Sequence, residues 1–302
     1  DDFMSLYTLL DMFNLLELEP LLMRYVLDDG QRGQWASCDF RTDKQVACGK
    51  ILRKFAPLMM GTTNGYQLTT NQAFDFRPHH HNNNVSRSDL VCAAHGAAGI
   101  GSLTDHGLIK SHGWEPGDYK ITHNHGRGGL MRRFRQHVME NLGLGHLAVV
   151  PRQAPHRVVL SLQASDIPAR RLKFVEELIT LEKLDNAVVE THVMKNLSLT
   201  EQLELAGQTA VYLTPCGGGA VTGMFLPEGA SIIIYYQHNG GVQNNRGTGL
   251  PAMLDWDIFS AMTHIRVHWY PMAARHDYVG QAGLLYLVKH ELFLIENLPS
   301  VV

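Results

Sequence analysis

The stretch PCGGGAVTGMFLPEGASIIIYY, residues 215–236, decides the fold class of this chain. Three consecutive glycines separate an apolar run from a short apolar segment, and a β-branched run then closes the unit. Glycine permits backbone conformations that other residues avoid, and it lets another group approach the backbone closely. The glycines therefore indicate either a tight turn with close helix–strand packing or a place where a bulky ligand meets the backbone.

Segments of strand and helix character alternate outward from this stretch. Strands are predicted for HRVVLSL (156–162), AVVETHVM (187–194), AVYLTP (210–215), SIIIYY (231–236) and RVHWYPM (266–272). Helices are predicted for PARRLKFVEELITLEKL (168–184), SLTEQLELAGQ (198–208), the segment after the glycines (217–226) and DWDIFSAMTHI (255–265). This alternation predicts an α/β fold with a parallel sheet and helices on both faces.

Local signals support several of these helices. In LMRRFRQHVMENLGLG, residues 130–145, apolar side chains recur every fourth residue, and Gly143 is expected to end the helix. Ser198 with Glu201 three residues on forms a capping box. Pro168 stands near the start of its predicted helix, where proline is tolerated.

The amino-terminal half has a different character. Residues 4–27 place apolar side chains at helical spacing, with Pro20 as the expected break. Residues 69–129, rich in Gly, His, Asn and Ser, are predicted to form a long irregular insertion. We therefore expect an amino-terminal domain over residues 1–145 and a carboxyl-terminal domain over residues 146–302.

Composition restricts the class of protein. The 302 residues are 45% hydrophobic and 18% charged, which is a globular composition, and the net charge of −3 offers no basic surface for nucleic acid. No apolar run is long enough to cross a bilayer. The four cysteines lack the Cys-x-x-Cys spacing that is typical of zinc sites. Asn84 and Asn196 begin glycosylation sequons, which point to a secretory lumen. The chain opens directly on a helical pattern, as would a fragment whose leader and membrane anchor are missing.

The predicted topology gives the glycine turn a chemical role. Ligands of open α/β sheets bind outside the carboxyl ends of the strands, and helix amino termini there favour phosphate groups. The strands VVLSL and AVYLT are expected to be parallel in one sheet, so the loops after both would leave from the same edge. We therefore expect Gly217–Gly219 and Arg170 or Arg171 to converge in one cleft around a diphosphate.

The segment LSLTEQLELAGQTAVYLTPCGGGAVTGMFLPEGASIIIYY, residues 197–236, resembles the signature segment of glycosyltransferase family 61. The matching positions are Pro215, Gly217, Gly219, Phe225, Leu226, Pro227, Gly229 and Ala230. Residues 130–144, 156–174 and 264–272 are similar to other segments of that family, in the family's order, and residues 46–55 and the first helix match more weakly.

This resemblance implies a GT-B-like architecture, with two Rossmann-like domains, a cleft between them, and an amino-terminal domain that is incomplete or divergent. It implies an inverting, metal-independent glycosyltransferase without cofactor, which moves a sugar, GlcNAc or a pentose, from a UDP-sugar to a glycan or glycoprotein acceptor in the Golgi or ER lumen. The expected nucleotide-sugar-binding residues are Gln163, Arg170, Arg171, Pro215, Cys216, Gly217, Gly218, Gly219 and Ala220. A carboxylate of the other domain would act as general base, and Asp11 is the candidate.

Several polar positions depart from the family's pattern. Cys216 stands where the family has histidine, Gln163 where it has a basic residue and Ile234 where it often has glutamate. In the first helix the family's His and Asp align weakly with Met4 or Ser5 and with Thr8. These changes together indicate altered substrate chemistry or lost activity, so the alternative is an inactive member that serves as a binding or scaffold module.

Other residues offer competing interpretations. His79–His81 could bind a metal or belong to a solvated low-complexity tract. His123 and His125 would share one strand face, where two imidazoles could also bind a metal. Cys216 resembles a nucleophile, but a small buried thiol is the simpler interpretation. Asp11 lies three residues after Thr8 on the same helix face, so it could replace a lost base or remain a solvated carboxylate.

Overall fold

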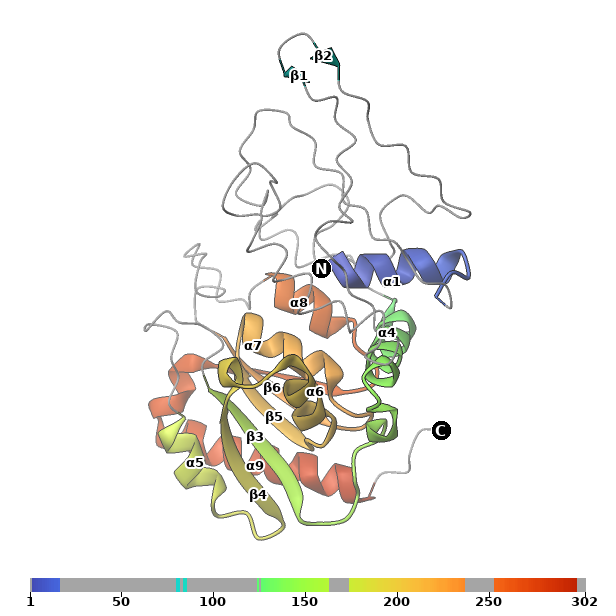
Figure 1. The fold of residues 1–302 in the computed structure, drawn as a ribbon. Coiled ribbons are helices and arrows are strands. Elements are labelled where there is room, and N and C mark those ends of the chain that lie inside the picture. Colours follow the sequence, from blue (N-terminus) through green and yellow to red (C-terminus); the bar gives the residue numbers. More distant parts are fainter. Residues whose placement is uncertain are drawn as a thin grey trace.

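The computed structural model describes residues 2–16, 80–81, 84–85, 124, 126–162, 174–236 and 253–297. Its main feature is a five-stranded, wholly parallel sheet in the order β4-β3-β5-β6-β7 (Figure 1). The strands are β3 (His156–Leu162), β4 (Ala187–Val193), β5 (Val211–Pro215), β6 (Ser231–Tyr236) and β7 (Arg266–Pro271). A separate two-stranded antiparallel pair joins β1 (His80–His81) to β2 (Asn84–Val85).

Helices connect the parallel strands, as predicted. They are α5 (Val175–Leu181), α6 (Leu199–Gly207), α7 (Gly218–Val221) and α8 (Met253–Ser260). The long helix α9 (Tyr278–Asn297) follows β7, and α1 (Asp2–Met12) and α4 (Gly128–Asn141) precede the sheet. The described residues also form the short 3-10 turns η3 (Gly145–Leu147), η5 (Met194–Asn196), η6 (Thr222–Phe225) and η7 (Met272–His276). The predicted α/β class with a parallel sheet is therefore confirmed, and the sheet is compatible with a Rossmann-like fold.

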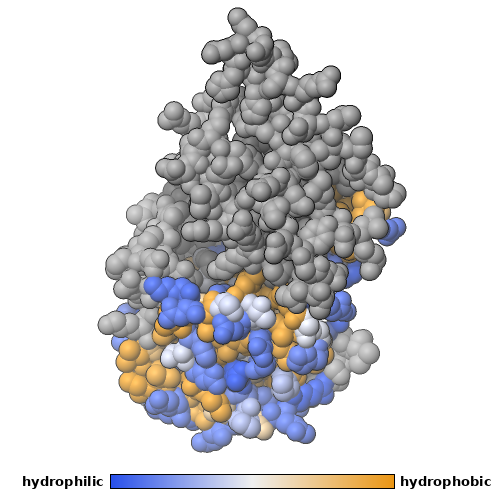
Figure 2. All heavy atoms as spheres, in the orientation of Figure 1, coloured by the Kyte–Doolittle hydropathy of each residue, from blue (hydrophilic) through white to orange (hydrophobic). Residues whose placement is uncertain are grey.

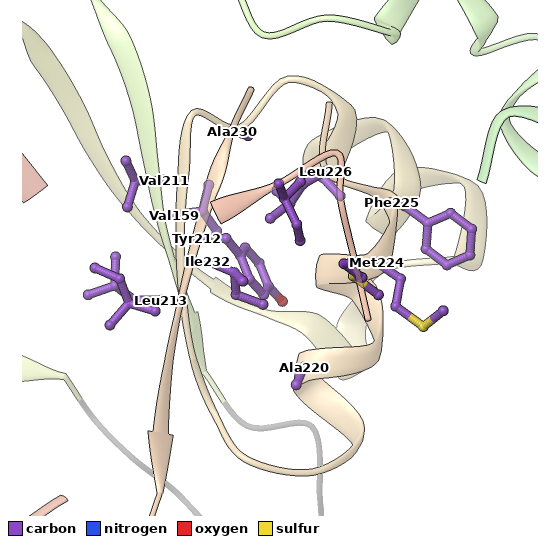
Figure 3. Packing of buried hydrophobic residues seen from close by; sticks show 14 of the residues in the cluster. Val159, Val211, Tyr212, Leu213, Ala220, Met224, Phe225, Leu226, Ala230 and Ile232 are labelled. Carbon is purple, nitrogen blue, oxygen red and sulfur yellow. The ribbon is translucent and has the colours of Figure 1, made fainter. Parts of the chain in front are cut away.

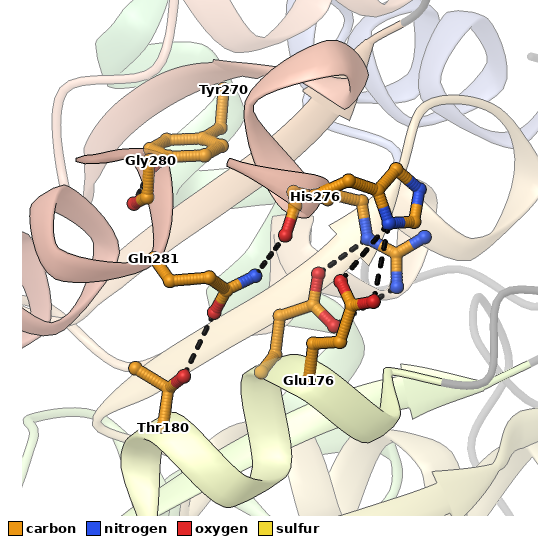
Figure 4. Close-up of polar contacts among 8 residues, drawn as sticks. Glu176, Thr180, Tyr270, His276, Gly280 and Gln281 are labelled. Atoms are coloured by element: carbon orange, nitrogen blue, oxygen red, sulfur yellow. Dashed lines mark hydrogen bonds and ion pairs between the residues drawn. The ribbon is translucent and has the colours of Figure 1, made fainter. Parts of the chain in front are cut away.

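The helices cover both faces of the sheet. Ser231 on β6 reaches Glu291 of α9, whereas its neighbour Ile232 lies against Gly223 of η6. Because successive strand residues point to opposite faces, α9 and η6 lie on opposite sides. Thr180 of α5 donates to Gln281 of α9 at 2.9 Å, so α5 shares the α9 face (Figure 4). Helix α6 packs on η6, on the other face.

This arrangement creates a topological switch point between β3 and β5. The two strands are neighbours, with Leu160 opposite Leu213. After β3 the chain reaches α5 on the α9 face, and after β5 it turns into α7 and η6 on the other face. The connections therefore diverge at the carboxyl ends of β3 and β5, where doubly wound sheets bind their ligands.

The core fills the layer between the sheet and α7–η6. Figure 3 shows Tyr212 and Ile232 of the strands facing Ala220, Met224 and Leu226. Tyr212, Ala220, Leu226 and Ile232 have no exposed surface, and Met224 has only 4%. These apolar runs bury a near-continuous hydrophobic surface, as expected for parallel strands covered on both faces. The exposed apolar surface includes Val175 and Ile179 of α5. Figure 2 shows apolar surface at the lower left of the molecule, where Figure 1 places α5.

Two predicted helix ends are confirmed by backbone geometry. Gly143 has φ = 73° and donates its N–H to the carbonyl of Glu140 at 2.9 Å, which closes α4. At the start of α6, the Ser198 side chain accepts the Glu201 N–H at 3.3 Å, and Glu201 Oε2 accepts the Ser198 N–H at 2.7 Å. Both donors would otherwise lack intrahelical acceptors.

The Ser198→Ala variant tests the capping box. We expect the free energy of unfolding to fall by about 1 kcal/mol, because the Glu201 amide at the start of α6 loses its acceptor, the Ser198 hydroxyl. Thr200→Ala, an exposed change in the same turn, is the control and should change stability by less than about 0.5 kcal/mol. Chemical denaturation followed by circular dichroism measures both, and equal values for the two variants would contradict the capping role.

The prediction of one helix over residues 168–184 is wrong. Helix α5 starts at Val175, because Phe174 has a left-handed backbone with φ = 47°. The Phe174 ring is fully buried, 5.4 Å from the ring of Tyr235. Tertiary packing of this ring stabilises a conformation that a phenylalanine rarely adopts, and it ends any helix arriving from Pro168.

The first helix is shorter than its periodicity predicts. It ends at Met12, and Asn14 has φ = 54°, long before the expected break at Pro20. Of the predicted insertion at residues 69–129, only β1, β2, Asn124 and residues 126–129 are described, and α4 already begins at Gly128. The proposed boundary between residues 1–145 and 146–302 thus remains a prediction.

Candidate functional site

The glycine turn lies at the carboxyl end of β5, at the switch point of the sheet. Cys216 donates its N–H to Tyr235 of β6 at 2.8 Å, which keeps the turn against the sheet edge. Gly217 follows with φ = 112° and ψ = −154°, a combination that essentially only glycine adopts. Its carbonyl accepts the Ala220 N–H at 2.8 Å as α7 begins.

The surroundings of two glycines distinguish the alternatives left open by the sequence. A Cβ atom on Gly223 would lie 2.3 Å from Ile232 Cδ1, so glycine there permits close helix–strand packing without moving the Ile232 side chain. A Cβ atom on Gly217 would meet nothing within 4 Å. Gly217 is therefore needed for its backbone conformation, and it leaves open space beside the turn.

A carboxylate that the sequence analysis did not single out lies against this turn. Asp255 of α8 accepts the Gly217 N–H at 2.8 Å and the Cys216 thiol at 2.7 Å, both through Oδ2. The residue is 3% exposed. Burial raises the pKa of Asp255, while the hydrogen bonds from Cys216 and Gly217 act in the opposite direction. A carboxylate 38 positions away in the chain gives no local sequence signal of this contact.

The predicted turn residues occupy one contiguous position in the fold. Pro215 ends β5 opposite Tyr235, Cys216 is half-buried, and Gly217 to Gly219 lead into α7. Ala220 is fully buried, so its side chain belongs to the core. Cys216 meets an acidic group instead of a base, which is unlike the surroundings of an activated thiolate.

The predicted residues of the neighbouring loop lie outside the described residues. Gln163, Arg170 and Arg171 fall in the segment between Leu162, the last residue of β3, and Phe174. The two ends of that segment are placed: β3 runs beside β5, and Phe174 lies at the start of α5. The predicted parallel pairing of these strands is thus confirmed, while the contacts of the arginines remain a prediction. His79, His123 and His125 are likewise outside the described residues.

Asp11 lies where α1 meets α4. Its carboxylate Oδ2 is 3.1 Å from Arg133 Nη2, and the rings of Tyr7 and Phe134 pack edge to face beside it. Thr8, on the same helix, is buried and donates its hydroxyl to the Met4 carbonyl. Among the described residues, the hydrogen bond from Arg133 to the Asp11 side chain links α1 to α4 and does not involve the glycine turn.

A second group of charged side chains supports the fold on the α9 face. Glu291 of α9 is 1% exposed and accepts hydrogen bonds from Ser231 and Arg266. His268 Nε2 lies 3.0 Å from Glu291 Oε1. Burial alone would raise the pKa of Glu291, but the hydrogen bonds from His268, Ser231 and Arg266 outweigh it and hold the pKa at about 2. This cluster ties α9 to β6 and β7.

The Glu291 cluster predicts acid sensitivity. Because the pKa in the folded state is about 2, below the usual 4.5, the stabilisation is present above pH 4.5 and is lost as the pH falls toward 2. By linkage, the free energy of unfolding falls by about 3 kcal/mol over that pH window. Unfolding titrations at several pH values should show that Glu291→Gln removes this part of the pH dependence, whereas Glu190→Gln, on the partly exposed strand β4, leaves it.

Buried His264 acts over a different pH window. Burial, followed by the charge of Arg135, lowers the pKa of His264 to about 4, so its neutral form is preferred in the folded state. The associated stability is present above pH 6.5 and is lost as the pH falls to 4. Glu291→Gln should therefore retain a decline between pH 6.5 and 4. If the stability of Glu291→Gln no longer fell at all below pH 6.5, the separate contribution of His264 would be contradicted.

A small cavity lies at the opposite edge of the sheet. It has a volume of about 220 Å³ and is lined by Pro151, Pro155, His156, Arg157, Gln208 and Ala210. His156 begins β3, and Ala210 precedes β5, so the cavity adjoins the amino ends of the strands. Ligands of open α/β sheets bind at the carboxyl ends, which makes the glycine turn the better candidate site.

Within the described ranges, no group of three or more His, Cys, Asp or Glu side chains could hold a metal ion. No helix in that part of the chain is long and apolar enough to cross a membrane.

The sequence matches no protein-family model, and a search of curated proteins also finds no match.

Proposed function

We propose that this protein is an inverting, metal-independent glycosyltransferase that moves a sugar from a nucleotide sugar to a glycan or protein acceptor. One observation carries the proposal: a glycine turn with open space beside Gly217 lies at the switch point between β3 and β5. The resemblance of residues 197–236 to glycosyltransferase family 61 adds the donor class. The donor is a UDP-sugar with GlcNAc or a pentose, and the reaction takes place in the Golgi or ER lumen.

The proposed architecture is of the GT-B type. Residues 146–302 would form the nucleotide-sugar domain, and residues 1–145 the acceptor-side domain, with the reaction between them. In this arrangement, the crevice at the carboxyl ends of β3 and β5 holds the nucleotide. Gln163, Arg170 and Arg171 belong to the segment that follows β3, so they reach the same crevice in the proposal.

The chemistry follows from charge development. The departing nucleoside diphosphate gains negative charge, which the first-turn amides of Gly218 and Gly219 and the arginine side chains stabilise without a metal. A carboxylate from the acceptor side accepts the proton of the attacking hydroxyl. Asp11 is the proposed base, and its ion pair with Arg133 would have to open for this step.

Isothermal titration of the protein against a panel of UDP-sugars tests the proposal. We expect saturable binding of at least one nucleotide sugar, accompanied by transfer to an acceptor. If neither a nucleotide nor a nucleotide sugar binds up to millimolar concentration, the proposal fails.

A second candidate function is a binding or scaffold module without catalysis. Its support is the bond between Cys216 and Asp255 at the position where the resembling family has histidine, together with the fully buried Ile234. This candidate predicts a cooperative thermal transition with weak or absent nucleotide affinity. Measured turnover on any acceptor excludes it.

A further inference from the structure

Asp255 brings a negative charge into the proposed site from a distant segment. In Figure 1, α8 lies next to α7, and the Asp255 carboxylate joins the two helices through the turn. With 3% of its surface exposed, the residue is nearly removed from water. A carboxylate this buried is costly without compensating hydrogen bonds, and the Gly217 amide and the Cys216 thiol supply two of them.

These bonds change what the turn can offer a ligand. The Gly217 N–H, which could otherwise donate to a phosphate oxygen, already donates to Asp255 Oδ2. A phosphate at that amide would have to displace the carboxylate, whose ionised form is favoured by the hydrogen bonds from Gly217 and Cys216 and would repel the phosphate at short range. Asp255 Oδ1 accepts no hydrogen bond from the described residues, so one acceptor oxygen remains at the turn.

We propose that Asp255 is a specificity-determining residue, which keeps phosphate away from the Gly217 amide and accepts a hydrogen bond from a hydroxyl group of the ligand. This inference rests on the proposed function and deepens it. The diphosphate then lies against the amides of Gly218 and Gly219, and the part of the crevice beside Gly217 takes a hydroxyl-bearing part of the nucleotide sugar. A carboxylate accepts hydrogen bonds from hydroxyl groups, but it has no hydrogen to donate to phosphate oxygens.

The Asp255→Asn variant tests this role because it removes the charge and keeps the shape. Two probes separate the effects: pyrophosphate carries only anionic groups, and uridine carries only hydroxyl and base groups. We expect pyrophosphate affinity to rise tenfold or more in the variant and uridine affinity to fall severalfold, both measured by isothermal titration. Unchanged or reduced pyrophosphate affinity overturns the inference.

A matched control is available on the same helix. Asp257 is also buried, at 2% exposure, and its carboxylate accepts hydrogen bonds from the N–H and the side-chain amide of Asn124. Asp257→Asn should leave pyrophosphate affinity within twofold of the wild type. An equal gain in both variants overturns the inference, because general loss of negative charge would then explain it.

A structural measurement keeps the inference testable if Asp255→Asn does not fold. Crystals of the wild-type protein soaked with pyrophosphate should retain the bond between Gly217 and Asp255, and a phosphate oxygen on the Gly217 amide overturns the proposed exclusion. The two proposals fail differently: wild-type protein that binds UDP while Asp255→Asn leaves pyrophosphate binding unchanged refutes only the role of Asp255. Absence of binding by UDP, uridine and pyrophosphate refutes both.

Discussion

Replacing Arg275 with methionine is expected to lower the free energy of unfolding by about 3–5 kcal/mol. Arg275 is 8% exposed and its Nη2 donates to Glu177 Oε2 at 2.9 Å, while its Nε donates to Oε1 of the same carboxylate. Glu177 has no exposed surface. The variant would leave this carboxylate buried without a counter-charge, which is the costly way to break a buried ion pair.

The surroundings of the pair add to the effect. The guanidinium carbon of Arg275 lies 5.3 Å from the ring centre of Phe174 and 5.9 Å from that of Tyr235. Arg275 therefore packs on Phe174, the residue that directly precedes α5. Loss of Arg275 should loosen the end of the segment that carries Arg170 and Arg171.

The neighbouring exposed pair provides a matched control. His276 and Glu176 lie next to Arg275 and Glu177 in sequence, on the same two elements, and are joined at 3.1 Å (Figure 4). Their side chains are 69% and 49% exposed, so His276→Ala should change stability by less than about 1 kcal/mol. Urea denaturation compares the variants. The double variant Arg275→Met with Glu177→Leu should recover most of the loss, and a loss below about 1 kcal/mol for Arg275→Met alone would contradict the role of the pair.

The second large effect is expected at the glycine turn. Gly217→Ala should reduce UDP affinity at least tenfold, because the added Cβ enters the open space beside the turn. The same change should lower stability by about 1–3 kcal/mol, because alanine is strained at φ = 112° and ψ = −154°. Titration calorimetry and thermal unfolding separate the two consequences.

Gly143→Ala is the control for Gly217→Ala. Gly143 also has a positive φ of 73°, and a Cβ there also meets nothing within 4 Å. It follows the end of α4, which precedes the sheet in the chain. Both variants should lose stability, but only Gly217→Ala should lose affinity. Equal affinity of the two variants for UDP would mean that the turn is needed only for folding.

Much of the sheet could be predicted because each strand is a continuous apolar run between turn signals. The predicted ranges 156–162 and 231–236 coincide with β3 and β6, and the capping box at Ser198 is present as predicted. Parallel strands buried on both faces produce such runs whatever their tertiary neighbours. No element is predicted after residue 272, although Leu284, Val288, Leu292 and Ile295 recur at helical spacing in α9.

The errors arise where long-range packing determines local structure. Phe174 reads as part of a helix, yet its burial against Tyr235 holds a left-handed backbone that starts α5 late. In the sequence, Asp255 has the pattern of an ordinary acidic residue in the first turn of a helix. In the structure it accepts a hydrogen bond from the N–H of Gly217, which is far from it in the chain. The glycine turn itself was predictable because its signal is local, whereas the residues that line it come from separate segments.

A crystal structure of the protein soaked with millimolar UDP tests whether a nucleotide binds at the switch point between β3 and β5. This binding mode predicts UDP at the carboxyl ends of these strands, with its phosphates at the amides of Gly218 and Gly219. UDP in the cavity beside His156 and Gln208, at the amino ends of the strands, or no bound UDP at all, would contradict it.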